Sequence, residues 1–311
     1  MENVNMEVDI GGLKIKNPVM PASGAFGHEM NEILDFNKLG AIVPKSITKH
    51  PRGGNMTPRV CEVRGGMINS IGIQSKGVDY YRDYIIPEFK DYDTPVIASI
   101  NADSVDEFAE MSEKIAMFDN VRALELNISC PNLENDGRAF GMDEEISYEL
   151  IKKAKGVTDL PIIPKLTPNV TSIQDIAIAC EKAGADSLNV ANTLLAMAID
   201  VETRKPKIGN VMGGLSGPGV KPIIVRMIYQ TSQVTNIPII GCGGVMNSDD
   251  AIEMILAGAT AVQIGTANFI NPNVMIETID GIEEYMKKHK VYDIKDLVGK
   301  VVIDKEKTNK I

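Results

Sequence analysis

The sequence predicts an α/β fold with a parallel sheet, and two patterns support this prediction. Short, nearly continuous apolar runs recur along the chain, and segments with helical spacing and capping residues separate most of them. Runs of this length are typical of strands that are buried on both faces, as the strands of parallel sheets are. The runs expected to be strands are residues 18–21, 41–43, 95–100, 123–128, 161–166, 187–190, 237–240 and 261–264.

The expected helices lie between these runs, at residues 104–118, 143–155, 172–183, 222–235 and 248–257. Gly184 and Gly258 each follow an alanine and precede the next strand, as glycines at helix C-termini do. Eight strands that alternate with helices are most economically arranged as a (β/α)8 barrel, the TIM barrel, with a doubly wound open sheet as the alternative. Alternating apolar residues flank Gly11 and Gly12, which predicts an N-terminal β-hairpin that caps one end of the barrel.

Composition and charge limit the class of protein. No linker rich in serine and proline divides the 311 residues, so residues 1–311 are expected to form a single domain. A net charge of −10 argues against a general nucleic-acid binder and against a protein held at a membrane by basic residues. The sequence also lacks a basic and apolar leader and any run of about 18 apolar residues, so we expect a cytoplasmic protein. Four cysteines and three histidines without ligand spacing predict neither a zinc site nor a disulfide framework.

Two long stretches, residues 48–80 and 191–219, are rich in glycine and polar residues and are expected to be irregular, functional loops. Barrel enzymes carry their reacting groups at the carboxyl ends of the strands. There the last two strands end in Gly243-Gly244 and Gly265-Thr266, where backbone amides can approach an anion. This pairing predicts a phosphate site, although tight turns without a ligand are the alternative.

Two lysines lie in or beside apolar strands. Lys45 follows Ala-Ile-Val-Pro, and Lys165 lies inside Ile-Ile-Pro-Lys-Leu. A buried ammonium group needs a negative partner. That partner is either an internal carboxylate or a ligand that carries or develops negative charge, and a reduced flavin fits the second description.

Asparagines gather at the same ends of the predicted strands. Each carboxamide offers two donors and an acceptor, which match the N–H and C=O edges of a pyrimidine or another cyclic ureide. A single asparagine at such a position often only stabilises a turn or caps a helix, but several asparagines at the ends of strands favour ligand binding. The four are Asn69, Asn127, Asn132 and Asn192.

Cys130 is the strongest candidate for a catalytic residue. It lies between Ser129 and Pro131, beyond the fourth predicted strand, whereas Cys180 falls on a helical face beside alanines. A thiol of pKa ~8.5 acts as a base near neutral pH when polar neighbours stabilise its thiolate. The alternative is a small buried apolar side chain.

Several motifs together resemble the class 1 dihydroorotate dehydrogenases, which are flavin enzymes of pyrimidine biosynthesis. The resemblance spans about residues 5–290 and is carried by ASGAFG, PKSIT, NSIGIQSKG, NISCPN, PKLTPN, ANT, LSGPGVKP, GCGG and GT, in the family's order and spacing. It implies a (β/α)8 barrel that holds FMN and oxidises dihydroorotate to orotate. It also makes Cys130 the catalytic base that removes a ring-carbon proton while the neighbouring carbon gives hydride to the flavin.

The resemblance implies two sets of contacts. The residues expected to contact FMN are Ser23, Lys45, Ser46, Ser99, Asn127, Lys165, Val190, Gly217, Gly243, Gly244, Gly265 and Thr266. The residues expected to hold dihydroorotate are Lys45, Asn69, Ser70, Ile71, Gly72, Ile73, Asn127, Asn132, Asn192 and Thr193. One departure is Ser99, because the NAD-linked class 1B enzymes carry asparagine at this position.

The segments after Cys130 and Asn69 resemble class 1B more than the fumarate-linked class 1A. Class 1B enzymes pair with a second subunit that carries FAD and a [2Fe–2S] cluster, and this chain has too few spaced cysteines to hold such a cluster. We therefore expect an electron-transfer partner, in a heterotetramer of two catalytic and two partner chains, with NAD as acceptor. The alternatives are a class 1A enzyme, a dihydropyrimidine dehydrogenase-like subunit, and a barrel that binds only a phosphate ligand or a protein.

Overall fold

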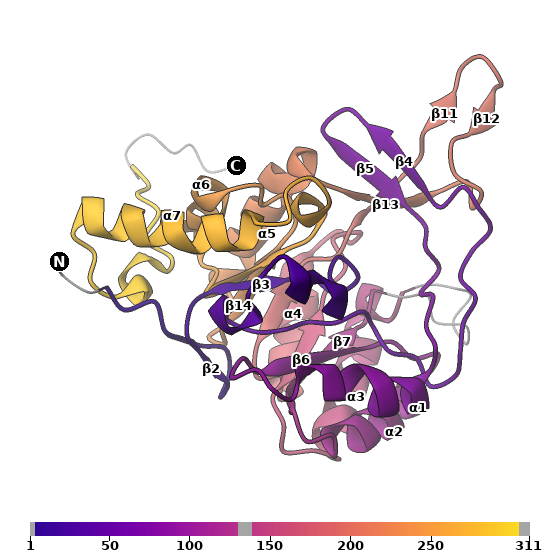
Figure 1. Ribbon diagram of the computed structural model, residues 1–311, viewed down its shortest axis with the longest axis horizontal. Coiled ribbons are helices and arrows are strands. Elements are labelled where there is room, and N and C mark those ends of the chain that lie inside the picture. Colours follow the sequence, from indigo (N-terminus) through magenta and orange to yellow (C-terminus); the bar gives the residue numbers. More distant parts are fainter. Residues whose placement is uncertain (1–3, 130–138, 305–311) are drawn as a thin grey trace.

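The computed structural model describes residues 4–129 and 139–304, and within them seven parallel strands form one sheet. Figure 1 shows that this sheet is curled. The order of its strands is β3-β15-β14-β9-β8-β7-β6. Apart from Arg122, every residue of these strands is buried, which explains their continuous apolar runs. The predicted α/β class with parallel strands is confirmed. The strands are β3 (Val19–Pro21), β6 (Val96–Ile100), β7 (Val121–Asn127), β8 (Ile162–Lys165), β9 (Leu188–Val190), β14 (Ile239–Cys242) and β15 (Ala261–Ile264).

The second predicted strand is not a regular strand, although its segment takes the eighth position of the barrel. Ile42 and Ile47 form isolated parallel bridges with β6, and the Gly40 amide donates to the Val19 carbonyl of β3 at 2.8 Å. The segment therefore joins the two outer strands of the sheet. A β-carbon at Gly40 would lie 2.1 Å from the Asn17 carbonyl oxygen, so this close approach requires glycine.

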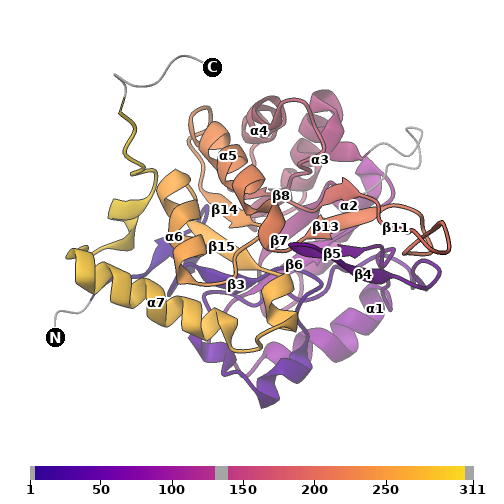
Figure 2. The same cartoon turned by 90° about the horizontal axis from the view of Figure 1, so that it is seen from above.

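The helices pack against the outer face of the sheet, and α2 to α7 lie side by side in chain order (Figure 2). Each predicted helix is present, with its ends shifted by at most three residues. Three features differ from the sequence prediction: short 3-10 helices follow β3, and α1 and α7 are further helices. No helix of the described residues is long and apolar enough to cross a membrane. The helices are α1 (Val78–Tyr80), α2 (Val105–Ala116), α3 (Glu144–Lys155), α4 (Ile173–Lys182), α5 (Lys221–Ser232), α6 (Ser248–Ala257) and α7 (Val274–His289).

The predicted N-terminal hairpin is formed by β1 (Val8–Asp9) and β2 (Lys14–Ile15), which are antiparallel. Gly11 at its turn has a φ of +84°, and a β-carbon there would lie 2.2 Å from the Asp186 carbonyl oxygen. Asp186 lies two residues before β9, so the hairpin contacts the amino end of this strand. It therefore lies opposite the end at which barrel enzymes carry their chemistry.

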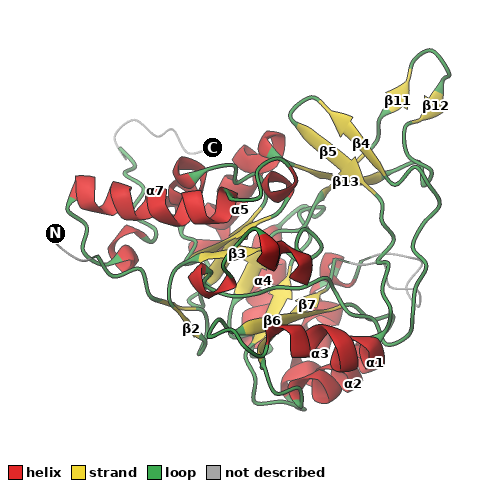
Figure 3. Ribbon diagram, viewed as in Figure 1, coloured by secondary structure: helices red, strands yellow, loops and turns green. Residues whose placement is uncertain are grey.

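The two stretches expected to be irregular instead pair with each other in a second, antiparallel sheet of order β10-β13-β5-β4. Figure 3 shows this sheet standing off from the barrel, next to a short hairpin of β11 and β12. Most of its residues are half-buried or exposed, and only Ile68 and Gly213 are buried, so the strands leave no continuous buried run in the sequence. The strands are β4 (Val60–Val63), β5 (Gly66–Asn69), β10 (Leu194–Ala196), β11 (Ile199–Asp200), β12 (Lys205–Pro206) and β13 (Gly213–Ser216).

Candidate active site

A cavity of about 870 Å³ lies at the carboxyl ends of the parallel strands, where the antiparallel sheet also contributes to its wall. Its lining comes from segments that are far apart in the sequence, and most of the predicted site residues are among them. They are Ser23, Lys45, Ser46, Asn69, Ser70, Ile71, Gly72, Ile73, Asn127, Lys165, Asn192, Thr193, Gly217, Gly243, Gly244, Gly265 and Thr266. A cavity of this size and position is where a barrel enzyme binds a cofactor and a substrate.

The two glycine turns lie next to each other because β14 and β15 are paired strands. Gly244 has a φ of +91°, and a β-carbon there would lie 2.6 Å from the Lys221 β-carbon. The amino end of α6 is partly occupied by side chains of this segment, since Asn247 Oδ1 accepts from the Asp250 amide at 3.1 Å and the Asp250 carboxylate accepts from the Met246 amide at 2.9 Å. The cavity wall formed by the glycine turns is therefore a better place for an anion than the helix terminus itself.

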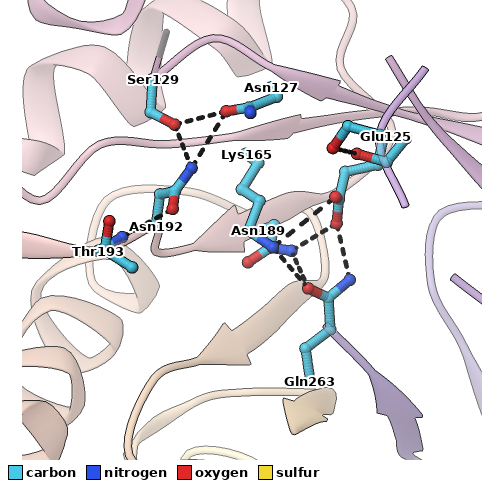
Figure 4. Close-up of polar contacts among 10 residues, drawn as sticks. Glu125, Asn127, Ser129, Lys165, Asn189, Asn192, Thr193 and Gln263 are labelled. Atoms are coloured by element: carbon cyan, nitrogen blue, oxygen red, sulfur yellow. Dashed lines mark hydrogen bonds and ion pairs between the residues drawn. The ribbon is translucent and has the colours of Figure 1, made fainter. Parts of the chain in front are cut away.

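Lys165, the last residue of β8, lies in a buried polar cluster with residues of β7, β9 and β15 (Figure 4). Its Nζ donates to Gln263 Oε1 at 2.9 Å and lies 3.7 Å from Glu125 Oε1. Asn189 Nδ2 donates to Glu125 Oε2 and to Gln263 Oε1, both at 2.8 Å, and Gln263 Nε2 donates to Glu125 Oε2 at 2.7 Å. Lys165 thus has the internal carboxylate partner that was one of its two predicted alternatives, and it also lines the cavity.

The charge of this cluster is fixed by its surroundings. Burial lowers the pKa of Lys165, but the nearby Glu125 carboxylate raises it, and the net direction is upward. Burial also raises the pKa of the Cys242 thiol, which therefore stays protonated at neutral pH. Lys165, which is 3% exposed, consequently places a charged ammonium group beside the cavity.

Three of the four predicted asparagines line the cavity, and two of them contact each other (Figure 4). Asn192 Nδ2 donates to Asn127 Oδ1 at 3.1 Å and also to the Ser129 hydroxyl. Ser129 Oγ donates to Asn127 Oδ1 at 2.5 Å, and Asn192 Oδ1 accepts from the Thr193 amide at 2.8 Å. Asn69, the last residue of β5, donates from its Nδ2 to the Gly214 carbonyl at 3.4 Å. These bonds hold the carboxamides at the cavity in defined orientations.

Four predicted site residues are not among the lining residues. Cys130 and Asn132 lie outside the described residues; the described chain stops at Ser129, which lines the cavity. Ser99 and Val190 are fully buried behind the wall. The Ser99 hydroxyl lies 2.9 Å from that of Ser46, so it supports a lining residue.

The structure also brings polar residues to the site that the sequence analysis did not single out. Glu125, Asn189 and Gln263 form the cluster around Lys165, and Asn101 lies on the cavity wall. A signal for all four was present, because each is a polar residue within or directly after an apolar strand run. Such residues are buried only when a partner or a ligand satisfies them.

Comparisons with known proteins agree with this geometry. A family model described as dihydroorotate dehydrogenase matches residues 5–286. The chain is 50% identical over 302 residues to the "Dihydroorotate dehydrogenase B (NAD(+)), catalytic subunit" of Caldicellulosiruptor saccharolyticus, an alignment that covers 96% of this chain and 100% of that protein. The protein of the same name from Porphyromonas gingivalis is 47% identical over 304 residues, covering 97% of this chain and 99% of its own. The chain therefore belongs to the dihydroorotate dehydrogenase family.

Proposed function

We propose that this protein is the catalytic chain of an NAD-linked dihydroorotate dehydrogenase, which uses FMN to oxidise dihydroorotate to orotate in pyrimidine biosynthesis. The observation that carries the proposal is the one cavity that the glycine turns, the buried Lys165 ammonium and the asparagines all line. The name shared by the relatives supports the same activity. We propose one domain over residues 1–311 and a cytoplasmic location.

The residues of the cavity fit FMN. Glycine at positions 243, 244 and 265 leaves room for an anionic phosphate beside backbone amides, and the Thr266 hydroxyl lies at the same turn. Lys165 places a positive charge on the wall, and Asn127 adds a carboxamide. Bound there, FMN supplies the hydride acceptor that the oxidation requires. The proposed contacts of Ser99 and Val190 with FMN would be indirect, through the residues in front of them.

The remaining polar residues of the cavity suit a small anionic ureide. Asn69 with residues 70–73, Asn192 and Thr193 line the wall with hydrogen-bonding groups, and Lys45 adds a cation for the substrate carboxylate. The chain of bonds from Ser129 through Asn127 to Asn192 restricts these side chains before the substrate arrives. We propose that this preorganisation orients the ring that is oxidised.

Cys130 is proposed as the base that takes the proton from the ring carbon. The cysteine follows Ser129, a residue of the cavity wall. Two other cysteines are poor candidates, because burial raises the pKa of Cys242 and raises that of Cys180 to about 12. A thiol that stays protonated at neutral pH does not accept a proton.

The electrons are proposed to leave through a partner subunit that carries FAD and a [2Fe–2S] cluster and reduces NAD. The relatives are named catalytic subunits of NAD-linked enzymes, and such a name implies a further subunit in those proteins. We propose two catalytic and two partner chains in the complex.

The proposal is tested by the substrate and acceptor specificity of the purified chain. With an artificial dye as acceptor, it predicts turnover of dihydroorotate and none of dihydrouracil, which lacks the carboxylate. Turnover of dihydrouracil would favour a dihydropyrimidine dehydrogenase-like enzyme. We predict that the chain does not reduce fumarate, and that it reduces NAD only together with the co-purified flavoprotein. Efficient reduction of fumarate by the chain alone would indicate a class 1A enzyme. Colourless protein without flavin absorption would refute the proposal.

A further inference from the structure

Asn101 is a buried carboxamide whose hydrogen-bonding capacity the described residues do not use. The residue directly follows β6, is 1% exposed and lines the cavity. Neither its Nδ2 nor its Oδ1 has a hydrogen-bond partner among the described residues. We propose that Asn101 is a ligand-binding residue whose carboxamide pairs with the N–H and C=O edge of a cyclic ureide, an edge that both flavin and dihydroorotate carry. This inference rests on the proposed function.

The unpaired state of Asn101 contrasts with that of Asn17, which lies near the amino end of β3 and away from the cavity. Asn17 is 3% exposed, its Nδ2 donates to the Lys38 carbonyl at 2.7 Å, and its Oδ1 accepts from the Val19 amide at 3.1 Å. Buried polar side chains are normally paired in this way, because an unpaired one lowers the free energy of unfolding. Other described side chains also carry a buried polar atom without a partner, but Asn101 alone among them lines the cavity, and both of its carboxamide atoms are unpaired. This combination favours a ligand as the missing partner.

The backbone fixes where Asn101 presents this group. The backbone amide of Asn101 donates to the Ile47 carbonyl at 2.8 Å. Ile100 pairs with Leu126 of β7, and this register places Asn101 beside Asn127. In the next pair of strands, Asn127 pairs with Lys165. Three successive strand ends thus contribute a carboxamide, a second carboxamide and an ammonium group to one cavity wall. Asn127 and Lys165 are both proposed to contact FMN, so Asn101 extends the same row.

Ser99 explains why the carboxamide comes from position 101. The two residues are separated by one position, so in an extended chain their side chains leave the backbone on the same side. Ser99 is short, and its hydroxyl lies 2.9 Å from that of Ser46. The Ser99 hydroxyl is thus paired with Ser46 and does not line the cavity, whereas Asn101 does.

The test compares Asn101→Ala with the matched control Asn17→Ala in protein loaded with FMN and in protein stripped of it. Loss of the carboxamide at position 101 is expected to weaken FMN or orotate about tenfold, which corresponds to about 1.4 kcal/mol. FMN affinity is measured by flavin fluorescence, and orotate affinity by the change it causes in the flavin spectrum. Weaker FMN binding assigns the contact to the cofactor, and weaker orotate binding alone assigns it to the substrate.

The stability of the stripped protein separates a ligand contact from a structural role. Asn101→Ala is expected to keep or raise the urea midpoint, because it removes an unpaired group, whereas Asn17→Ala lowers the midpoint and leaves both affinities unchanged. The isosteric Asn101→Asp keeps acceptors but loses the amide donors, and it should also weaken binding. Unchanged affinities in both Asn101 variants, or a midpoint that falls as it does in Asn17→Ala, would overturn the inference. Wild-type protein that binds no flavin would instead refute the proposed function.

Discussion

Replacing Glu125 by glutamine should destabilise the protein strongly, because it leaves the buried Lys165 ammonium without its counter-charge. The two groups lie 3.7 Å apart and both are buried. At this separation and an effective dielectric constant of about 20, their attraction is about 4.5 kcal/mol. Loss of one partner of a buried ion pair costs a similar amount, about 3–5 kcal/mol. We therefore expect Glu125→Gln and Lys165→Met each to lower the free energy of unfolding by about this much.

A double-mutant cycle tests this reasoning. The measurement is urea unfolding of FMN-free protein at pH 7, followed by circular dichroism. The double variant removes both charges, so its loss should be several kcal/mol smaller than the sum of the single losses. The exposed Lys153, which pairs with Asp106 at 2.8 Å and with Glu149 at 3.1 Å, is the control, and Lys153→Met should cause little change in the free energy of unfolding. Single losses that simply add would show that Glu125 does not compensate Lys165.

Three further predictions address the glycine turn, a core thiol and the proposed base. Gly244→Ala should lower the urea midpoint, because the φ of Gly244 is +91° and the new β-carbon would lie 2.6 Å from Lys221. Gly265→Ala is the control and should leave the midpoint nearly unchanged, because its new β-carbon would come no closer than 3.5 Å to another residue. Equal midpoints in the two variants would contradict this prediction. Burial raises the pKa of the Cys180 thiol from 9.0 to about 12. The unfolded chain therefore loses this proton first as the pH rises, so the stability that the buried thiol contributes is complete below pH 9 and is lost between about pH 9 and 12. The fall of the urea midpoint over this range should be shallower in Cys180→Ala, and an identical slope would rule the thiol out as its cause. Cys130→Ser should lower dihydroorotate turnover at neutral pH by orders of magnitude while FMN stays bound, because a serine hydroxyl is a far poorer base; unchanged turnover would remove Cys130 from the mechanism.

The parallel sheet could be predicted from the sequence because its strands are buried on both faces. Such strands appear as continuous apolar runs, and the helices between them carry capping residues such as Ser104, which accepts from the Glu107 amide. The antiparallel sheet could not be predicted in this way. Asn69 and Gly214 are paired across 145 residues, and their strands are too short and too exposed to carry a pattern.

The site was predicted to a similar extent. Glycine pairs and asparagines at strand ends marked the cavity, because their positions follow from the strand pattern alone. The cluster of Glu125, Asn189 and Gln263 was missed, since which buried polar residues meet depends on the order of strands around the sheet. The assignment of Cys130 as the base stays a prediction, because the cysteine lies outside the described residues.

The most direct test of the central claim is an anaerobic titration of the FMN-loaded chain with dihydroorotate, followed by its visible spectrum. If the cavity at the strand ends holds flavin and substrate against each other, one equivalent of dihydroorotate should bleach the flavin and release orotate. A flavin spectrum that stays unchanged in excess dihydroorotate would contradict the account.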